Sequence, residues 1–225
     1  MNILIDDWQS WEARFQTFLT EQEEQADVAH DLGHILRVVA NARKLAALSH
    51  ADLHIVIPAA WLHDCVSVPK SSPLRKQASR MAAQAAGEFL SQAGYPSQFI
   101  PAIQHAIEAH SFSANIAPRS LEAQVVQDAD RLDSLGAIGI ARCLMLGAVL
   151  ERPLYDLEEP LPHHRPADDQ RYTIDHFYTK LLTLADTMQT PAGRAEAEKR
   201  TEVMRLYLQQ LASEIQFSPD QSSSS

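Results

Sequence analysis

Apolar residues recur at three- and four-residue steps along most of the chain, a pattern that predicts amphipathic helices packed on a core. The sequence is rich in Ala, Leu, Gln, Glu and Arg, which favour helices, and it has only 7 glycines and no β-hairpin signal. We therefore predict an all-α fold. The expected helices cover an N-terminal segment around 8–19 and then 31–48, 52–65, 74–93, 97–110, 121–133, 136–150, 173–189 and 192–215.

Three segments interrupt this helical pattern. The prolines and serines of "VSVPKSSP" (66–73) leave little room for regular structure, so we predict a loop there. The segment "ERPLYDLEEPLPHHRPADDQR" (151–171) is long, proline-rich and charged, which indicates an ordered functional loop or a lid more than a tight turn. The final "SPDQSSSS" (218–225) has the composition of a disordered tail.

The N-terminal helix carries a single aromatic and aliphatic stripe, which predicts that it packs on the core. The stripe consists of Trp8, Trp11, Phe15, Phe18 and Leu19.

Three further helices have predictable features. In the helix over 31–48, the expected buried face comprises Leu32, Ile35, Leu36, Val39, Ala42 and Ala46. The helix over 52–65 either kinks at Pro58 or starts there, because proline suits a first helical turn. The longest apolar stretch, 135–150, is interrupted by Arg142 and is shorter than the roughly 20 residues that a membrane span needs, so we predict a buried helix.

Length, charge and cysteine content narrow the class of protein. A chain of 225 residues with 45% hydrophobic content can bury its core as one domain. The net charge of −10 argues against a nucleic-acid polymer or an anionic membrane as partner. Cys65 and Cys143 do not suggest a disulfide framework, and the N-terminus lacks the basic region of a signal peptide. We expect a cytoplasmic protein.

The stretch "AAWLHDC" places His63 and Asp64 at the end of an apolar run, where ionisable groups need partners or a metal ion. A histidine from "HDLGH" and Asp130 would complete a set of two imidazoles and two carboxylates. Such a set suits Mn, Fe, Co, Ni, Zn or Mg and leaves two octahedral positions for water and substrate. Spacing alone leaves open whether His30 or His34 takes part, and whether these are ordinary core or surface residues.

The sequence segments around these residues resemble those of the HD superfamily, whose members are all-helical, metal-dependent phosphohydrolases. They are similar to the small bacterial HD-domain proteins of the YedJ kind, related to the YpgQ nucleotide pyrophosphohydrolase. The resemblance runs from about residue 25 to 215. It is carried by "AHDLGHILRV" (29–38), "HDCVSVPKSSP" (63–73), "AHSFSANIAP" (109–118), "VVQDADRLDSLGAIGIAR" (125–142), "HRPADDQRYTIDHFYTKLL" (164–182) and "TMQT" (187–190).

The resemblance implies an HD-type helical bundle over 25–217, preceded by a helical extension over 1–24 and followed by the tail. It also implies one divalent ion. Mn²⁺ is the ion we expect, and Mg²⁺, Co²⁺, Ni²⁺, Zn²⁺ and Fe²⁺ are alternatives. In the family pattern the first ligand is followed three residues later by Arg and then Val. This matches His34 with Arg37 and Val38, so the resemblance excludes His30 as the ligand. The implied metal ligands are His34, His63, Asp64 and Asp130.

Three aspartates of "DADRLD" have different expected roles. Asp133 lies about 60° from Asp130 around a helix, so it shares a face with that ligand and is predicted to orient a ligand or the water. Asp128 lies about 200° away and is predicted to cap the helix or face solvent. We assign catalytic roles to Asp64 and Asp133.

Positive charge gathers directly after the His-Asp doublet. No Asp or Glu occurs from Cys65 to Gly87, although the chain as a whole is acidic. Lys70 and Arg75 in this window are predicted to clamp phosphate oxygens, the alternative being an ordinary solvated basic surface.

Three other residues are predicted at the substrate. His110 ends a helix and is predicted to donate a proton to the leaving phosphate, since imidazole titrates near neutral pH. His176 and Lys180 stand four residues apart, on one face of a helix, and are predicted to line the substrate pocket. Helix capping and ring packing are the alternatives for all three. Cys65 is expected to be a small buried apolar residue and not a nucleophile.

The metal site predicts hydrolysis of a phosphorylated substrate through a metal-activated water. The resemblance implies that the substrate is a nucleoside triphosphate, cleaved to a monophosphate and pyrophosphate. The partner would be a small phosphorylated molecule, with neither nucleic-acid polymer nor membrane involved. One alternative is a phosphomonoesterase of the 5′-nucleotidase type, although "HDCVSVPK" lacks the glutamate that such HD enzymes carry after the doublet. A regulatory nucleotide-binding module without turnover is another. A two-iron oxygenase is disfavoured because the histidines available as extra ligands, His105 and His110, stand five residues apart, roughly 140° around one helix, and cannot easily both point inward.

Overall fold

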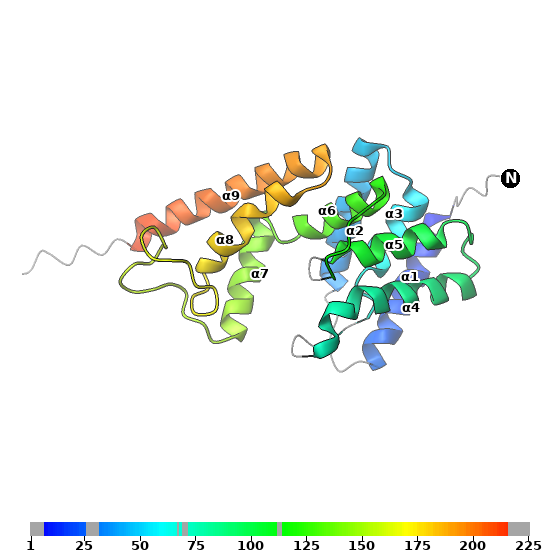
Figure 1. Ribbon diagram of the computed structural model, residues 1–225, viewed down its shortest axis with the longest axis horizontal. Coiled ribbons are helices and arrows are strands. Elements are labelled where there is room, and N and C mark those ends of the chain that lie inside the picture. Colours follow the sequence, from blue (N-terminus) through cyan, green and yellow to red (C-terminus); the bar gives the residue numbers. More distant parts are fainter. Residues whose placement is uncertain (1–6, 26–31, 67, 69–71, 112–113, 216–225) are drawn as a thin grey trace, which may run out of the picture. The chain divides into compact units, whose positions relative to one another are not determined.

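The computed structural model describes residues 7–25, 32–66, 68, 72–111 and 114–215. The all-α prediction is confirmed, and none of the residues in these ranges forms a strand (Figure 1). The predicted disordered tail lies outside the described residues. The elements are α1 (Trp8–Gln25), α2 (Leu32–Ser49), α3 (Leu53–Leu62), η1 (Pro73–Gln77), α4 (Ala78–Gln92), α5 (Ile100–His110), α6 (Leu121–Leu132), α7 (Gly136–Val149), α8 (Asp175–Thr179), η3 (Leu181–Thr187) and α9 (Pro191–Ile215), where η marks a 3-10 helix.

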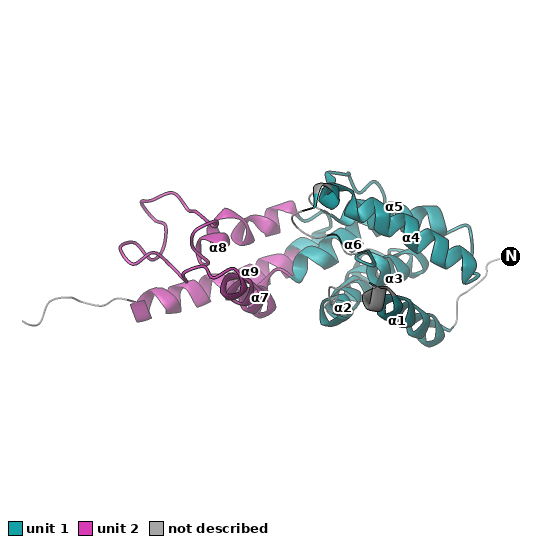
Figure 2. Ribbon diagram, turned by 90° about the horizontal axis from the view of Figure 1, so that it is seen from below, with its two compact units in different colours: residues 1–133, 188–194 teal, residues 134–187, 195–225 magenta. Residues whose placement is uncertain are grey.

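The chain divides into two compact units (Figure 2). Unit 1 consists of residues 1–133 and 188–194, and unit 2 of residues 134–187 and 195–225. In unit 1, α2, α3, α5 and α6 pack on one another, while α4 packs against α5 and α1 against α3. The domain limits predicted after residues 24 and 217 stay predictions.

Helix α1 packs on unit 1 through its aromatic stripe, as predicted. Phe15 has no exposed surface, and its ring lies 6.4 Å from that of Trp61 between centroids. Trp11 meets the ring of Tyr95 edge-on, with 4.8 Å between centroids. Helix α1 is therefore part of the core of unit 1.

Helix α2 buries most of the predicted face. Leu36 was placed on that face, and this is wrong, because its side chain is 48% exposed. The buried face is turned by about 50° around the helix from the predicted one, so that Val38 and Leu45 take part instead. Its members are Ile35, Val38, Val39, Ala42, Leu45 and Ala46.

Helix α3 brings the His-Asp doublet to the core. The side chain of Asp52 caps it by accepting the amide of His54 at 2.9 Å, so the helix begins before Pro58 and contains it. It ends at Leu62, three residues earlier than predicted, and residues 56–62 are all buried. His63 follows as the C-terminal cap. A helix that is apolar on every side thus ends on an imidazole inside unit 1.

Unit 2 contains α7, α8, η3 and the part of α9 from Ala195 onward. The single helix predicted over 173–189 is wrong, because the backbone leaves the helical region at Lys180 (φ −142°, ψ −57°). Leu181 and Leu184 are buried, and three-residue spacing is the period of a 3-10 helix, which explains the form of η3. Lys180 therefore does not share a helical face with His176.

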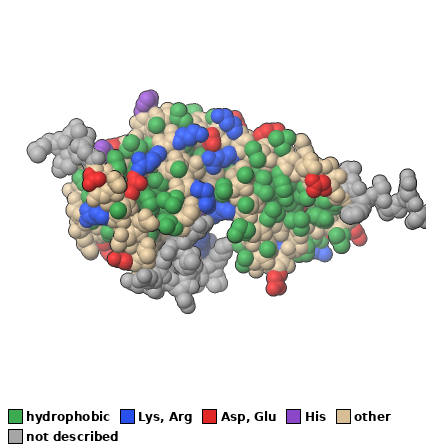
Figure 3. All heavy atoms as spheres, turned by 180° about the vertical axis from the view of Figure 1, so that it is seen from behind, with side chains coloured by type: hydrophobic (Ala, Val, Ile, Leu, Met, Phe, Trp, Pro, Cys, Tyr) green, Lys and Arg blue, Asp and Glu red, His purple; other side chains and the backbone are tan. Residues whose placement is uncertain are grey.

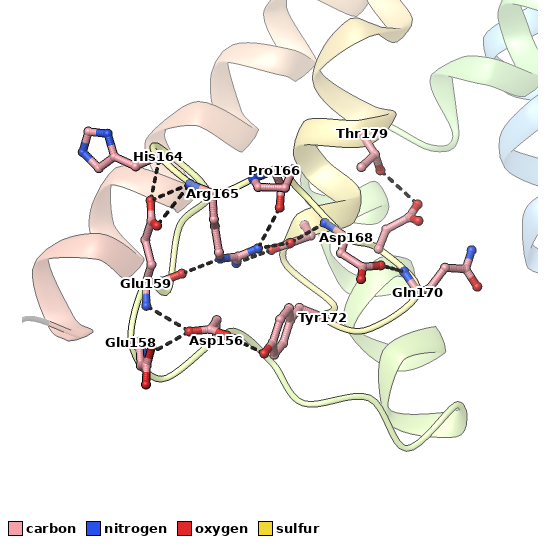
Figure 4. Close-up of polar contacts among 12 residues, drawn as sticks. Asp156, Glu158, Glu159, His164, Arg165, Pro166, Asp168, Gln170, Tyr172 and Thr179 are labelled. Atoms are coloured by element: carbon pink, nitrogen blue, oxygen red, sulfur yellow. Dashed lines mark hydrogen bonds and ion pairs between the residues drawn. The ribbon is translucent and has the colours of Figure 1, made fainter.

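Hydrogen bonds and ion pairs hold the segment 151–171 in place (Figure 4). Arg165 donates from both terminal nitrogens to the buried carboxylate of Asp175, at 2.5 and 2.8 Å, and from Nε to the carbonyl of Glu159 at 3.0 Å. Asp156 accepts the Tyr172 hydroxyl and the amides of Glu158 and Glu159. These contacts give an ordered conformation to a stretch without helices.

Helix α7 forms where it was expected, but the prediction that it is buried is wrong for one side. Met145 is 69% exposed and Val149 79%. The side that is buried consists of small residues, namely Gly136, Gly139, Cys143 and Gly147. No single helix among the described residues has the length and apolar character to cross a membrane; only α6 and α7 taken together, with a bend between them, meet that test.

Candidate metal centre

His63 lies at the centre of a cluster of imidazoles and carboxylates in unit 1. Its side chain has no exposed surface, and its Nδ1 donates to the carbonyl of Ala60 at 2.9 Å. In the neutral ring, Nε2 therefore carries the lone pair. Burial lowers the pKa of His63, and the charge of Asp64 opposes this only in part, so the neutral form is favoured.

His34 approaches His63 from α2. Its Nδ1 contacts Oδ2 of Asp133 at 2.7 Å, which fixes the proton on Nδ1 and leaves the lone pair on Nε2. The two Nε2 atoms of His34 and His63 are 3.3 Å apart, and Oδ1 of Asp130 lies 3.4 Å from the first and 3.9 Å from the second. Two lone pairs and a carboxylate oxygen thus converge on one point.

Asp133 is held in place by Arg37, which was not among the predicted site residues. Arg37 donates from Nε to Oδ1 of Asp133 at 2.6 Å and from Nη2 to Oδ2 at 3.1 Å. The carboxylate is 1% exposed, so this ion pair offsets its burial. The available signal was the three-residue spacing of Arg37 from His34, which puts both on one side of α2.

Asp64 lies between two imidazoles. Its Oδ2 is 3.6 Å from Nε2 of His63, and its Oδ1 is 3.4 Å from Nε2 of His110. Burial raises the pKa of Asp64, but the charges and hydrogen bond of His63 and His110 outweigh it and hold the pKa well below its usual range. The carboxylate is thus ionised at neutral pH and available to a cation.

His110, at the end of α5, donates from Nδ1 to the carbonyl of Ile107 at 2.6 Å. Burial lowers its pKa, whereas the hydrogen bond and charge of Asp64 raise it, and the net pKa is raised. The ring faces Asp64, as a group of the site should, and its role as proton donor stays a prediction.

The donor set fits a divalent ion. Two groups of potential ligand atoms, each within 4.8 Å of one another, share His63: His34, His63 and Asp130 form one, and His63, Asp64 and His110 the other. In the first group the outer nitrogens of His34 and His63 are engaged, so their inward nitrogens and the oxygen of Asp130 are acceptors with no hydrogen between them. Nitrogen and oxygen acceptors in this arrangement are the ligands that first-row divalent ions take.

Asp128 does not have the predicted position. It is fully buried, and its carboxylate accepts the amides of Gln189 and Thr190, both at 2.8 Å, and the Thr190 hydroxyl at 2.7 Å. It therefore ties the residues before α9 to α6 instead of facing solvent. The helical period correctly turned Asp128 away from Asp130 around α6. The sequence could not show that a segment some sixty residues later, with Gln189 and Thr190, covers that side of the helix.

The predicted substrate contacts are only partly described. Lys70 lies outside the described residues, and Arg75 is exposed, with Nη1 donating to the carbonyl of Val68 at 3.1 Å. His176 and Lys180 belong to unit 2, where Nδ1 of His176 contacts Asp169 at 2.8 Å. Binding of substrate by these four residues stays a prediction.

Comparison with known proteins settles the family. The HD domain matches residues 31–135, a range that contains every residue of the cluster. YpgQ of Bacillus subtilis (strain 168) is 33% identical over 204 residues, which is 89% of each chain. The chain belongs to the HD family.

Solved structures of HD proteins agree with this. An HD-superfamily hydrolase from Bacillus thuringiensis matches with a TM-score of 0.73 and 32% identity over 92% of this chain and 97% of its own. Bacillus subtilis YpgQ in complex with ADP matches with a TM-score of 0.68 and 32% identity over 90% and 98%. The HD family relationship supports a hydrolase, and the relative's complex shows that a protein of this kind binds a nucleotide.

Proposed function

We propose that this HD protein is a metal-dependent phosphohydrolase that cleaves nucleoside triphosphates to monophosphate and pyrophosphate. The observation that carries the proposal is the convergence of the His34 and His63 nitrogens with Asp130, beside Asp64 and His110. The ADP complex of YpgQ supports a nucleotide as substrate. Mn²⁺ is the proposed ion, and a reducing cytoplasm the proposed location, in keeping with two free, buried cysteines.

The residues of the proposed site have different roles. His34, His63, Asp64 and Asp130 would hold the ion, which when bound polarises a phosphoryl oxygen and lowers the pKa of water. Asp133 accepts a hydrogen bond from the Nδ1–H of His34 and so keeps the opposite nitrogen turned inward. Lys70 and Arg75 are proposed to hold phosphate oxygens, and His110 to supply a proton to the leaving group.

The test is product analysis with purified protein. Nucleoside triphosphates and phosphomonoesters are incubated with Mn²⁺ or with chelator, and phosphate and pyrophosphate are measured separately. We expect pyrophosphate from triphosphates only when metal is present. Release of phosphate from monoesters would favour the nucleotidase instead, and bound nucleotide without any product would favour a regulatory module.

A pair of variants links the activity to the cluster. Asp64→Ala should lower kcat/KM by more than the roughly 10–100-fold that loss of a supporting partner causes, because it removes a ligand. Glu88→Ala, which removes an exposed carboxylate on α4, serves as the matched control and should keep full activity. Full activity of Asp64→Ala would contradict the assignment of the metal centre.

A further inference from the structure

Arg37 on α2 directs two of its donors to one buried carboxylate. Figure 3 shows the ordinary place of basic side chains, which is the surface in contact with solvent. The side chain of Arg37 is 33% exposed, yet its guanidinium reaches inward to Asp133, which is 1% exposed. Nε lies 2.6 Å from Oδ1 and Nη2 lies 3.1 Å from Oδ2. Because one planar group holds both oxygens, it fixes the plane of the carboxylate as well as its position.

The same carboxylate contacts the first of the proposed metal ligands. Oδ2 of Asp133 accepts from Nδ1 of His34 at 2.7 Å, and the opposite nitrogen of that ring, Nε2, lies 3.4 Å from Oδ1 of Asp130. Carboxylates behind ligating histidines commonly set the orientation of the ring. The direction of the His34 ring therefore depends on the plane of Asp133, and that plane depends on Arg37.

The packing of α2 on α6 adds to this dependence. Asn41, one turn after Arg37, donates from Nδ2 to the carbonyl of Ala129 at 3.4 Å, one turn before Asp133. These paired contacts are those of two antiparallel helices in a fixed register. Helix α6 ends directly before Asp133, which is its C-terminal cap. Contacts from α2 thus hold this side chain in place of a further helical turn.

We propose that Arg37 is a positioning residue of the metal centre. Its two-pronged contact sets the plane of Asp133 and, through Asp133, the direction in which His34 offers its inward nitrogen. The inference rests on the proposed metal centre and adds a residue that acts through two others. Lysine would supply the charge without the fork, since an ammonium group is a point charge on a flexible stem. The shape of the arginine side chain, and not its charge alone, is what the site requires.

The test measures the Kd of the full chain for Mn²⁺ by calorimetry. We expect Arg37→Lys to raise the Kd roughly 10–100-fold, the range for loss of a supporting partner, and Arg37→Ala to raise it at least about tenfold. Removal of a positive charge near a cation would by itself lower the Kd, so a raised Kd in Arg37→Ala reports lost orientation. Arg43→Ala is the matched control, because Arg43 lies on the same helix but pairs with Glu12 of α1, and its Kd should not change.

A second measurement needs no metal. In metal-free protein with ¹⁵N-labelled histidines, NMR correlations between ring nitrogens and carbon-bound protons identify the tautomer of each ring. We expect the Nδ1–H form of His34 in the unaltered chain and in Arg43→Ala, and a mixture of the two tautomers in Arg37→Ala. Circular dichroism checks that each variant is folded, and Arg37→Lys replaces Arg37→Ala in both measurements if the alanine variant is not.

The two measurements separate this inference from the proposed function. If the unaltered chain does not bind Mn²⁺, the proposed function fails, and the histidine spectra still decide the role of Arg37. The proposal would be overturned by a His34 tautomer that the Arg37 variants leave unchanged, by a Kd that they leave unchanged or lower, or by a Kd of Arg37→Lys equal to that of the unaltered chain.

Discussion

The ring of His63 shows how one backbone hydrogen bond restricts the chemistry of a site. Its Nδ1 is occupied by the Ala60 carbonyl, so only Nε2 remains to bind a cation. Both groups of potential ligands use that atom. One lone pair binds one ion, so the two groups are alternative or merged parts of a single site and not two independent sites.

The support behind His34 can be tested at the level of metal affinity. Asp133→Asn keeps the volume of the buried side chain but removes its charge, which weakens the contacts to His34 and Arg37. We expect the Kd for Mn²⁺, measured by calorimetry, to rise roughly 10–100-fold. Glu88→Gln, on an exposed carboxylate of α4, is the control. A Kd that does not change in Asp133→Asn would remove Asp133 from the site.

The cysteines should be unreactive in the folded protein. Burial, and then the charge of Asp64, raise the pKa of Cys65 to about 12, and burial raises that of Cys143 to about 11. Raised pKa values keep both thiols protonated at pH 8, where an unperturbed thiol of pKa about 8.5 is partly ionised. Alkylation by iodoacetamide, followed by mass spectrometry, should be fast only in denaturant. Rapid labelling of the folded chain between pH 8 and 9 would contradict this.

Among the secondary-structure elements, α9 depends on a contact far away in sequence. Asp128 accepts three hydrogen bonds from Gln189 and Thr190, and the nearest atom to a side chain added at Gly193 would be its Oδ2, at 2.3 Å. Asp128→Ala leaves buried donors without an acceptor, each costing roughly 1–3 kcal/mol. We expect the free energy of unfolding in urea to fall by about 3 kcal/mol.

Gly193→Ala should be destabilising in the same direction, because its methyl group would displace the carboxylate. Glu198→Ala, exposed in the same helix, should change the unfolding free energy by less than about 0.5 kcal/mol. Equal stability of all three variants would show that the contact to α6 contributes nothing.

Sequence reasoning was most successful where a signal is local. Helical periodicity and the placement of proline and glycine predicted most helices to within a few residues. The motifs shared with the HD superfamily indicated that His34, His63, Asp64 and Asp130 belong to one site. It failed where the answer depends on distant residues. The burial of Asp128 comes from Thr190, the break at Lys180 from packing of Leu181 and Leu184, and the exposure of α7 from what covers it. Apolar periodicity cannot tell a covered helix from an uncovered one.

For the molecule as a whole, a bound ion should raise thermal stability. A ligand present at 100 times its Kd stabilises the folded state by about 2.7 kcal/mol, which corresponds to a rise in Tm of roughly 5–10 °C for a chain of this size. We expect this rise with Mn²⁺ in differential scanning fluorimetry and its reversal by chelator. Asp130→Asn should lose the rise. A Tm that Mn²⁺ leaves unchanged would argue against an ion in this site.

The chain order of unit 1 has a consequence for any attempt to shorten the protein. Residues 188–194 belong to unit 1 although all of 134–187 precedes them, and they supply the donors for Asp128. A fragment ending at residue 135, the limit of the HD match, would contain every proposed metal ligand and yet leave the buried carboxylate of Asp128 without its hydrogen bonds. The unit that contains the candidate metal centre is thus complete only when the polypeptide has passed through unit 2 and returned.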